Sequence, residues 1–259
     1  MIDTNVSLFR WPFRRLIGDE QAELVARLRK KGVTQAWAAS FEGLFCRDVA
    51  GVNSRLAAAC REHGRDFLVP FGCINPKLPA WEEDLRRCQE VHRMPGIRLH
   101  PNYQNYKLDD PAFAELISAA ANRGLLVQIA LSMEDPRTQF LLMQVPPVDP
   151  TPLADLLPRF PKLRLLLLNA GYWGGATTPH ISTLKQAGNV WFDIAMNERV
   201  GGLERLIEQT SPSRVVFGSH YPFFYFESAL LKVRGAGLSH DEELAITEGN
   251  ARALLGSQS

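Results

Sequence analysis

The chain has 259 residues, of which 46% are hydrophobic and 22% are charged, and its formal net charge is +1. This composition is typical of a folded globular protein and excludes disordered, collagen-like and small disulfide-rich classes. The balance of charges argues against a nucleic-acid-binding or membrane-surface protein, which would carry a basic face. A length near 250 residues is what one barrel of eight βα units requires.

The start of the chain does not resemble a secretory signal, because Asp3 and several arginines lie where an apolar stretch would be needed. No apolar run approaches the ~20 residues that span a bilayer. The four cysteines are Cys46, Cys60, Cys73 and Cys88, without a CxxC pair. We therefore expect reduced, mostly buried thiols and a cytoplasmic protein.

Short apolar segments alternate with helical patterns along the chain. The predicted strands cover residues 2–6, 33–39, 66–73, 96–100, 125–131, 163–169, 190–195 and 214–219. The helical patterns cover 19–31, 49–63 and 80–93, and others begin near Asp110, Thr151 and Ser239, the last with capping-box spacing to Glu242. Several strands are apolar on both faces, as in a parallel sheet covered by helices.

Eight βα units predict an α/β fold, a single (β/α)8 TIM barrel with eight parallel strands that forms one domain over residues 1–259. A doubly wound Rossmann sheet is the alternative, but no GxGxxG follows the first strand. The long connection at 132–150 contains several prolines. We predict that it is a lid, a rim loop or an oligomer contact.

Reacting groups of a TIM barrel stand at the carboxyl ends of its strands, so polar residues there are the candidates for a site. They include Asn5, Ser7, Arg98, His100, Asn102, Tyr103, Asn169, Trp173, Asp193, His220 and Tyr221. This ring is polar and aromatic, and it is too poor in carboxylates to favour paired-carboxylate glycosidase chemistry. His63, His92, His180 and His240 fall in or near helices and are interpreted as surface residues.

Five short segments, in this order and spacing, resemble the amidohydrolase-related (amidohydrolase 2) branch of the amidohydrolase superfamily. They are IDTNVS at 2–7, GIRLHP at 96–101, LLNAG at 167–171, FGSHYP at 217–222 and EGNA at 248–251. The resemblance covers nearly the whole chain and implies a TIM-barrel hydrolase. It also implies a divalent metal held by two opening histidines, by histidines ending strands five and six, and by an aspartate ending strand eight.

The chain departs from that pattern at each metal-binding position. The residues there are Asn5 and Ser7 in the opening pair, Ala130 on strand five, Asn169 on strand six and His220 on strand eight. Amide and hydroxyl groups are weak ligands for a transition metal, and an imidazole that can become cationic disfavours a dication. We therefore expect no bound metal and no other cofactor. A three-ligand site of His100, Asp193 and His220 is the alternative.

Three functions remain open. The first is a metal-independent hydrolase or lactonase of a small carboxylated substrate, as the metal-independent 2-pyrone-4,6-dicarboxylate lactonases of this superfamily suggest. Its catalytic residues would be His220 as general acid or base, with Asn5, Ser7 and Asn169 as hydrogen-bond donors. Its substrate-binding residues would be Arg98, His100, Asn102, Tyr103, Trp173 and Tyr221. The second function is an inactive member that binds a small ligand or a partner at the barrel mouth, and the third is a metal-dependent hydrolase or decarboxylase with unconventional ligands. A homodimer is also compatible with the sequence.

Each candidate also has a purely structural interpretation. His220 could bond to the backbone, Arg98 could form a buried ion pair with Asp3 or Asp193, and the amides could fill a vacated cavity. Ser219 precedes His220 directly, so strand alternation predicts that the two face opposite sides and form no Ser–His pair. Ser7 could pair with His220 instead. Cys46 and Cys73 are interpreted as small apolar fillers rather than nucleophiles.

Overall fold

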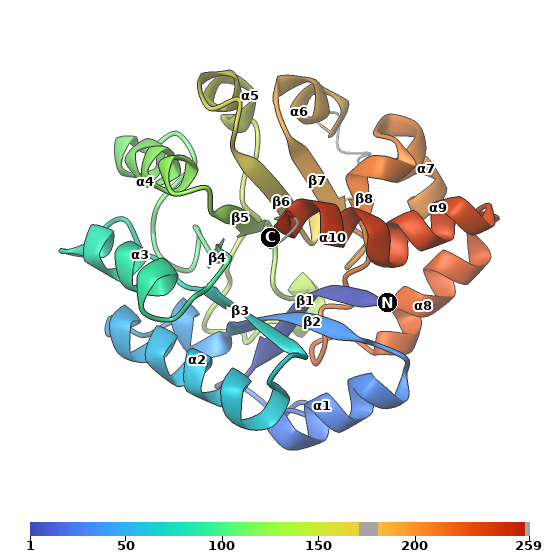
Figure 1. Ribbon diagram of the computed structural model, residues 1–259, viewed down its shortest axis with the longest axis horizontal. Coiled ribbons are helices and arrows are strands. Elements are labelled where there is room, and N and C mark those ends of the chain that lie inside the picture. Colours follow the sequence, from blue (N-terminus) through green and yellow to red (C-terminus); the bar gives the residue numbers. More distant parts are fainter. Residues whose placement is uncertain (171–180, 257–259) are drawn as a thin grey trace.

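Eight parallel strands form a ring in which each strand pairs with its neighbour in the chain, and helices surround the ring (Figure 1). The computed structural model describes residues 1–170 and 181–256. The strands are β1 (Ile2–Leu8), β2 (Gln35–Ser40), β3 (Leu68–Gly72), β4 (Gly96–Leu99), β5 (Leu126–Ala130), β6 (Arg164–Leu168), β7 (Val190–Asp193) and β8 (Val215–Val216). Main-chain hydrogen bonds from Thr4 N to Phe217 O and from Ser7 N to Tyr221 O join the end of the ring to its start. The predicted TIM barrel is confirmed.

The helices follow the strands as the sequence pattern predicts. They are α1 (Gln21–Lys30), α2 (Val49–Gly64), α3 (Trp81–Glu90), α4 (Pro111–Asn122), α5 (Leu153–Leu156), α6 (Ile181–Ala187), α7 (Gly202–Gln209), α8 (Phe226–Gly235), α9 (His240–Leu244) and α10 (Asn250–Leu255). Helix α4 begins with Pro111, whose fixed φ suits a first turn. The predicted capping box of Ser239 and Glu242 is present at the start of α9.

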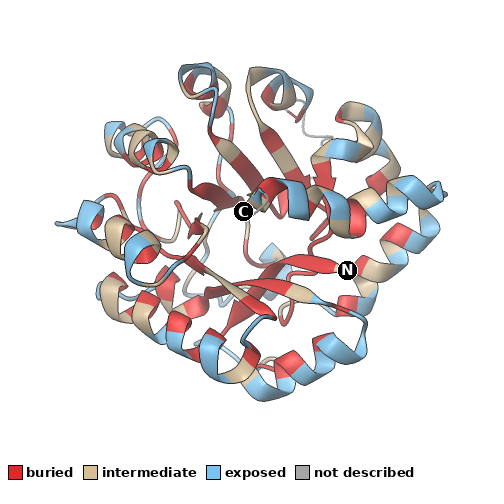
Figure 2. Ribbon diagram, viewed as in Figure 1, coloured by how far each residue is buried: buried red, intermediate tan, exposed pale blue. Residues whose placement is uncertain are grey.

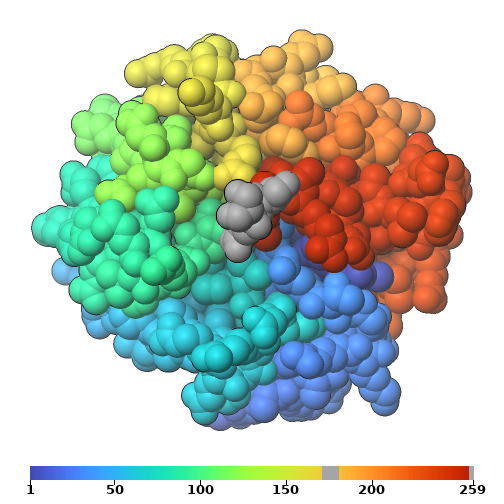
Figure 3. All heavy atoms as spheres, viewed as in Figure 1, coloured from blue at the N-terminus to red at the C-terminus, as the bar shows by residue number. Residues whose placement is uncertain are grey.

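Burial follows the ring. The strands are buried, whereas the outer faces of the surrounding helices are exposed to solvent (Figure 2). Helix α10 lies over the end of the barrel where the strands begin, near the centre of the face seen in Figure 3. Its Ala251 and Leu254 pack on an apolar layer inside the ring, which contains Ile2, Trp37, Phe71, Leu126, Leu166, Leu168 and Val216. No helix within the described ranges is long and apolar enough to cross a membrane.

The opposite end of the barrel is closed by aromatic side chains. Trp11 is buried there and packs on Phe41, Leu44, Ala130 and Met133, with Leu16, Tyr103 and Phe223 partly buried around them. The rings of Trp11 and Phe223 are 4.8 Å apart, centroid to centroid. Between this aromatic cluster and the apolar layer near α10, the interior of the ring carries polar side chains, and these form the candidate site.

Candidate functional site

Arg98 lies at the centre of the polar layer. It is 1% exposed, and its Nε donates to Gln128 Oε1 at 2.7 Å. Its two terminal nitrogens donate to main-chain oxygens of β1 and β2 and, at 3.4 Å, to Asn5 Oδ1. All five N–H groups of the guanidinium therefore have protein partners. Burial lowers the pKa of Arg98 to about 9, so it stays charged at neutral pH.

Two amides and a carboxylate join β1, β6 and β7 across the ring. Asn5 Nδ2 donates to Asn169 Oδ1 at 2.9 Å and to Asp193 Oδ2 at 2.7 Å. Asp193 also accepts from Asn169 N at 2.8 Å. Burial raises the pKa of Asp193 to about 7, because desolvation outweighs these hydrogen bonds. The structure thus brings together two residues that the sequence placed at metal-binding positions.

Asp3 forms a second buried connection, between β1 and the segment after β8. Its carboxylate accepts from Ser219 Oγ at 2.5 Å, from Ser219 N at 3.0 Å and from Asn5 N at 3.1 Å. Burial nevertheless raises its pKa to about 6. Neither Asp3 nor Asp193 forms a salt bridge with Arg98, so the predicted buried ion pair is not formed, although both carboxylates attract the guanidinium from a longer distance.

His220 and His100 are the two imidazoles of the barrel interior, exposed by 1% and 2%. The Nε2 atom of His220 lies 2.7 Å from the carbonyl oxygen of Met133. Because a carbonyl only accepts, Nε2 carries the proton and Nδ1 holds a lone pair. The Nδ1 atoms of both histidines are buried and have no hydrogen-bond partner among residues 1–170 and 181–256. Burial lowers the pKa of His220 to about 4 and that of His100 to about 3, so both are neutral at pH 7.

Backbone strain marks two of these positions. Asn169 and His220 have φ angles of 60° and 58°, in the left-handed region that non-glycine residues rarely adopt. Such strain persists where the surroundings impose it, and it is concentrated at functional sites. Strand β8 ends at Val216, before the predicted residue 219.

The connection at 132–150 covers the mouth from the β5 side. Asn169 Nδ2 donates to Ser132 O at 2.5 Å, and Glu134, 3% exposed, forms an ion pair with Arg14 of the β1–α1 connection. At the other end of the connection, Asn102 Nδ2 donates to Pro146 O at 2.7 Å. These hydrogen bonds and the ion pair hold the segment on the barrel at both of its ends.

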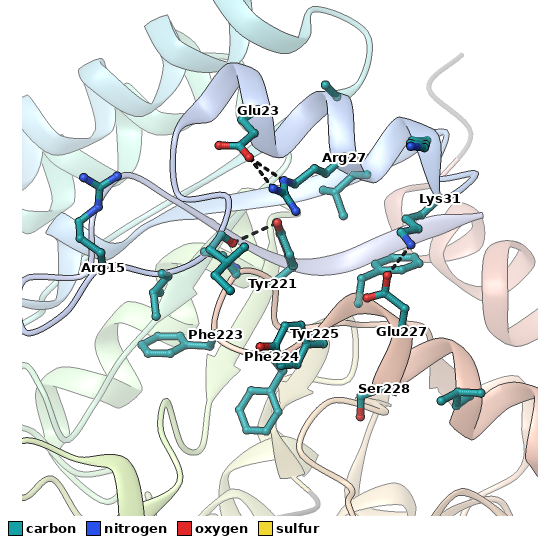
Figure 4. Close-up of a pocket in the computed structure, with 18 residues that line it drawn as sticks. Arg15, Glu23, Arg27, Lys31, Tyr221, Phe223, Phe224, Tyr225, Glu227 and Ser228 are labelled. Atoms are coloured by element: carbon teal, nitrogen blue, oxygen red, sulfur yellow. Dashed lines mark hydrogen bonds and ion pairs between the residues drawn. The ribbon is translucent and has the colours of Figure 1, made fainter.

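Tyr221 lies apart from the other candidates. Its hydroxyl donates to Ile17 O at 3.1 Å in a groove of about 1190 Å³ outside the ring, between α1 and the start of α8 (Figure 4). The ion pair of Glu23 and Arg27 lies on the α1 side of this groove. His220 and Tyr221 are neighbours in sequence, but the structure separates their side chains.

The remaining candidates have more varied positions. Ser7 is buried, and no hydrogen bond of its hydroxyl joins it to His220. Tyr103 contacts Trp11 at a centroid distance of 6.3 Å, within the aromatic cluster. Trp173 lies outside the described residues, as does His180. Sequence reasoning missed Trp11, Arg14 and Glu134, although the dense aromatic and basic run at 9–15 could have drawn attention to the first two.

A family model described as "Amidohydrolase" matches residues 15–257. The chain belongs to this amidohydrolase family. No curated protein sequence matches the chain. Solved structures share the fold of this amidohydrolase at low sequence identity.

Three of these solved structures illustrate the likeness. One is 5-carboxyvanillate decarboxylase from Sphingomonas paucimobilis, with 17% identity, a TM-score of 0.76 and 98% of both chains covered. The second is a dihydroxybenzoic acid decarboxylase from Polaromonas sp. JS666 with bound manganese and the inhibitor 2-nitroresorcinol. It has 13% identity and a TM-score of 0.74, and covers 98% of this chain and 96% of that chain. The third is a probable 2-pyrone-4,6-dicarboxylic acid hydrolase from Acinetobacter baumannii with citric acid bound, with 14% identity, a TM-score of 0.69 and 98% of both chains covered. At these identities the likeness establishes the fold.

Proposed function

We propose that this amidohydrolase binds a small carboxylated substrate at the carboxyl end of the barrel and hydrolyses it with its own side chains. The observation that carries the proposal is the state of His220. Its Nε2–H is fixed on Met133 O, which orients the ring and leaves the lone pair of the buried Nδ1 without a partner in the described chain. A neutral, oriented imidazole with a free lone pair is the arrangement a general base requires.

The proposed substrate class is supported by the structural neighbours. Two of the three are decarboxylases of aromatic acids, and the third is a dicarboxylic acid hydrolase with citric acid bound. Their ligands are small and rich in oxygen. In this chain, Asn169 and His220 direct N–H donors at acceptors in the mouth, which suits such a ligand.

The residues at the family's metal-binding positions do not suit a transition metal. Asn5 and Asn169 are engaged with each other, and Nδ2 of Asn5 also donates to Asp193. Ala130 offers no donor atom, and the Nε2 of His220 carries a proton that faces a carbonyl. Zinc and related ions require several imidazole, thiolate or carboxylate ligands. This donor set therefore favours metal-independent chemistry.

A metal-dependent decarboxylase is the second candidate, and the neighbours favour it. Two of them are named as decarboxylases, and one of these contains manganese. On this alternative, His100, Asp193 and His220 are the ligands that the sequence suggests, although no three histidine, cysteine or carboxylate side chains within residues 1–170 and 181–256 are grouped closely enough to hold an ion. The two candidates differ in metal content, in sensitivity to chelators and in the product released.

The test uses the full chain, purified without chelator and analysed for metals. It is assayed with and without EDTA or added manganese against a panel of lactones, esters, amides and hydroxybenzoates. We expect hydrolysis that EDTA does not reduce and that His220→Ala lowers by about 100-fold or more. His240→Ala, in the exposed start of α9, is the matched control and should leave the rate unchanged. Stoichiometric metal with EDTA-sensitive release of carbon dioxide would replace this proposal with the decarboxylase.

A further inference from the structure

Three consecutive residues of the 132–150 connection fill the barrel mouth with acceptor oxygens. Ser132 O accepts from Asn169, and Met133 O accepts from His220 at 2.7 Å. The Glu134 carboxylate pairs with Arg14, although its side chain is only 3% exposed. Two carbonyls and one carboxylate are thus held by one amide, one imidazole and one guanidinium.

The residues that hold these oxygens come from separate parts of the barrel, and the connection in turn orients two of them, since Met133 O fixes the His220 ring and Thr138 O accepts a second bond from Arg14. Asn169 and His220 follow β6 and β8 in strained left-handed conformations. Arg14 lies between β1 and α1, with its guanidinium 5.6 Å from the Phe223 ring, and that ring stacks on His220 at 5.1 Å. Asn169 and His220 are buried, whereas the Arg14 side chain is 37% exposed and lies at the rim. Amide, imidazole and guanidinium donors grouped in this way are the usual means of recognising a carboxylate.

We propose that residues 132–134 occupy the ligand site as an internal substitute for a carboxylated ligand, and that such a ligand binds by displacing them. This inference rests on the proposed function, since it assumes that the mouth takes a small carboxylate. It adds the three residues that would hold the ligand's oxygens, Asn169, His220 and Arg14. It also makes the 132–150 connection a gate whose closed state competes with binding.

The tip of the connection, residues 139–145, is built so that it can move at modest cost. Leu141 and Leu142 are 86% and 88% exposed, so the tip buries little apolar surface. The tip is closed on itself by hydrogen bonds between Gln139 and Val145. Its main apolar contact with the barrel is the stacking of Phe140 on Phe13, at a centroid distance of 5.3 Å. The tip can therefore move without loss of core packing, whereas Met133 and Val148, 3% and 4% exposed, anchor the connection in the core on either side of it, so displacement of residues 132–134 must also release the Met133 side chain.

Displacement has a chemical consequence for His220. A ligand carboxylate in place of Met133 O would put an anion on Nε2–H, and a nearby anion raises the pKa of an imidazole. The Nδ1 lone pair would then be more basic when substrate is bound than when the connection fills the site. The gate and the base are thereby linked through one hydrogen bond.

The test compares Glu134→Gln with the wild-type full chain. This change keeps the shape of the side chain and removes the charge that pairs with Arg14. If closed and open states compete, apparent affinity rises as the open fraction rises. We expect Glu134→Gln to bind benzoate and citrate about tenfold more tightly in calorimetric titrations. Glu90→Gln, which alters exposed ion pairs with Arg86 and Arg123, is the matched control and should bind as wild type does.

Hydrogen exchange of the amides at 131–148 provides the second measurement and needs no variant. The Val148 N–H, bonded to Leu131 O at 2.8 Å, is a convenient reporter. We expect saturating citrate to accelerate exchange of this segment in the wild-type chain, and Glu134→Gln to accelerate it without ligand. If substrate binds or turns over while the segment exchanges as slowly as it does without ligand, the gate is overturned and the proposed function stands. A loosened segment in Glu134→Gln with no carboxylate binding would overturn the ligand site itself. Carboxylate binding with displacement but no hydrolysis of any substrate would support the gate and refute the hydrolase.

Discussion

Replacing Arg98 with methionine tests whether this residue holds the barrel together or binds substrate. The guanidinium donates to Gln128, to Asn5 and to three main-chain oxygens, all buried. Each orphaned buried acceptor costs about 1–3 kcal/mol, but relaxation and the removal of a buried charge offset part of the sum. Breaking a buried charged network costs about 3–5 kcal/mol, and we expect Arg98→Met to lose that much.

A loss of this size is a large part of the roughly 5–15 kcal/mol that stabilises an ordinary protein. For a chain of this length it corresponds to a Tm lower by about 6–20 °C, measured by calorimetry or circular dichroism. Arg98→Lys keeps the positive charge but has fewer hydrogen-bond donors, so its Tm should lie between the Tm of the wild-type chain and that of Arg98→Met. Arg86→Met on the exposed face of α3 is the control and should leave the Tm unchanged. An unchanged Tm for Arg98→Met would refute the structural role, and lost ligand binding in that stable variant would restore the substrate-binding role predicted from the sequence.

Two further predictions concern pH and packing. Burial raises the pKa of Asp193 to about 7, whereas burial lowers the pKa of His220 to about 4 and that of His100 to about 3. Asp193 binds its proton at a higher pH in the folded state than in the unfolded state, so acidification from pH 7 to 4 stabilises the fold through this residue. The two histidines bind their protons at a higher pH in the unfolded state, so the same acidification destabilises the fold through them. Asp193→Asn should lose stability more steeply over this range in thermal unfolding, and parallel profiles for variant and wild type would contradict the assigned shifts. Gly96→Ala would place a Cβ 2.2 Å from a main-chain oxygen of β5, so it should lower the free energy of unfolding in urea by about 1–3 kcal/mol. Gly235→Ala is the control, because open space surrounds that position, and it should not destabilise the chain. Equal urea midpoints for the two variants would show that β4 can shift to accept the methyl group.

The barrel could be predicted from the sequence because each strand carries its own signal. The run at β6, Arg164–Leu168, is buried over four of its five residues, as its continuous apolarity indicates. The order of β and α segments then leaves few topologies. None of this depends on which side chains meet inside the ring.

The contacts of the site could not be predicted in the same way, because they depend on closure of the ring. Alternation along a strand predicts opposite orientations for Ser219 and His220, but β8 ends at Val216 and the left-handed φ at His220 breaks that pattern. Both residues are buried in the barrel, and Tyr221 lies in the outer groove instead. Likewise, nothing local indicates that residues 132–134 return to the mouth, since their partners come from β6, β8 and the first connection.

The hydrogen bonds inside the ring join residues that are far apart in the chain. Asn5 lies 164 positions from Asn169 and 188 from Asp193, and Asp3 lies 216 positions from Ser219. These bonds can form only after β1 has met β6, β7 and the segment after β8, so we expect them to be weak in the transition state for folding. Substitutions there should mainly accelerate unfolding and should have little effect on the folding rate. The polar layer would then determine how long the barrel stays closed, whereas the apolar strands determine how quickly it assembles.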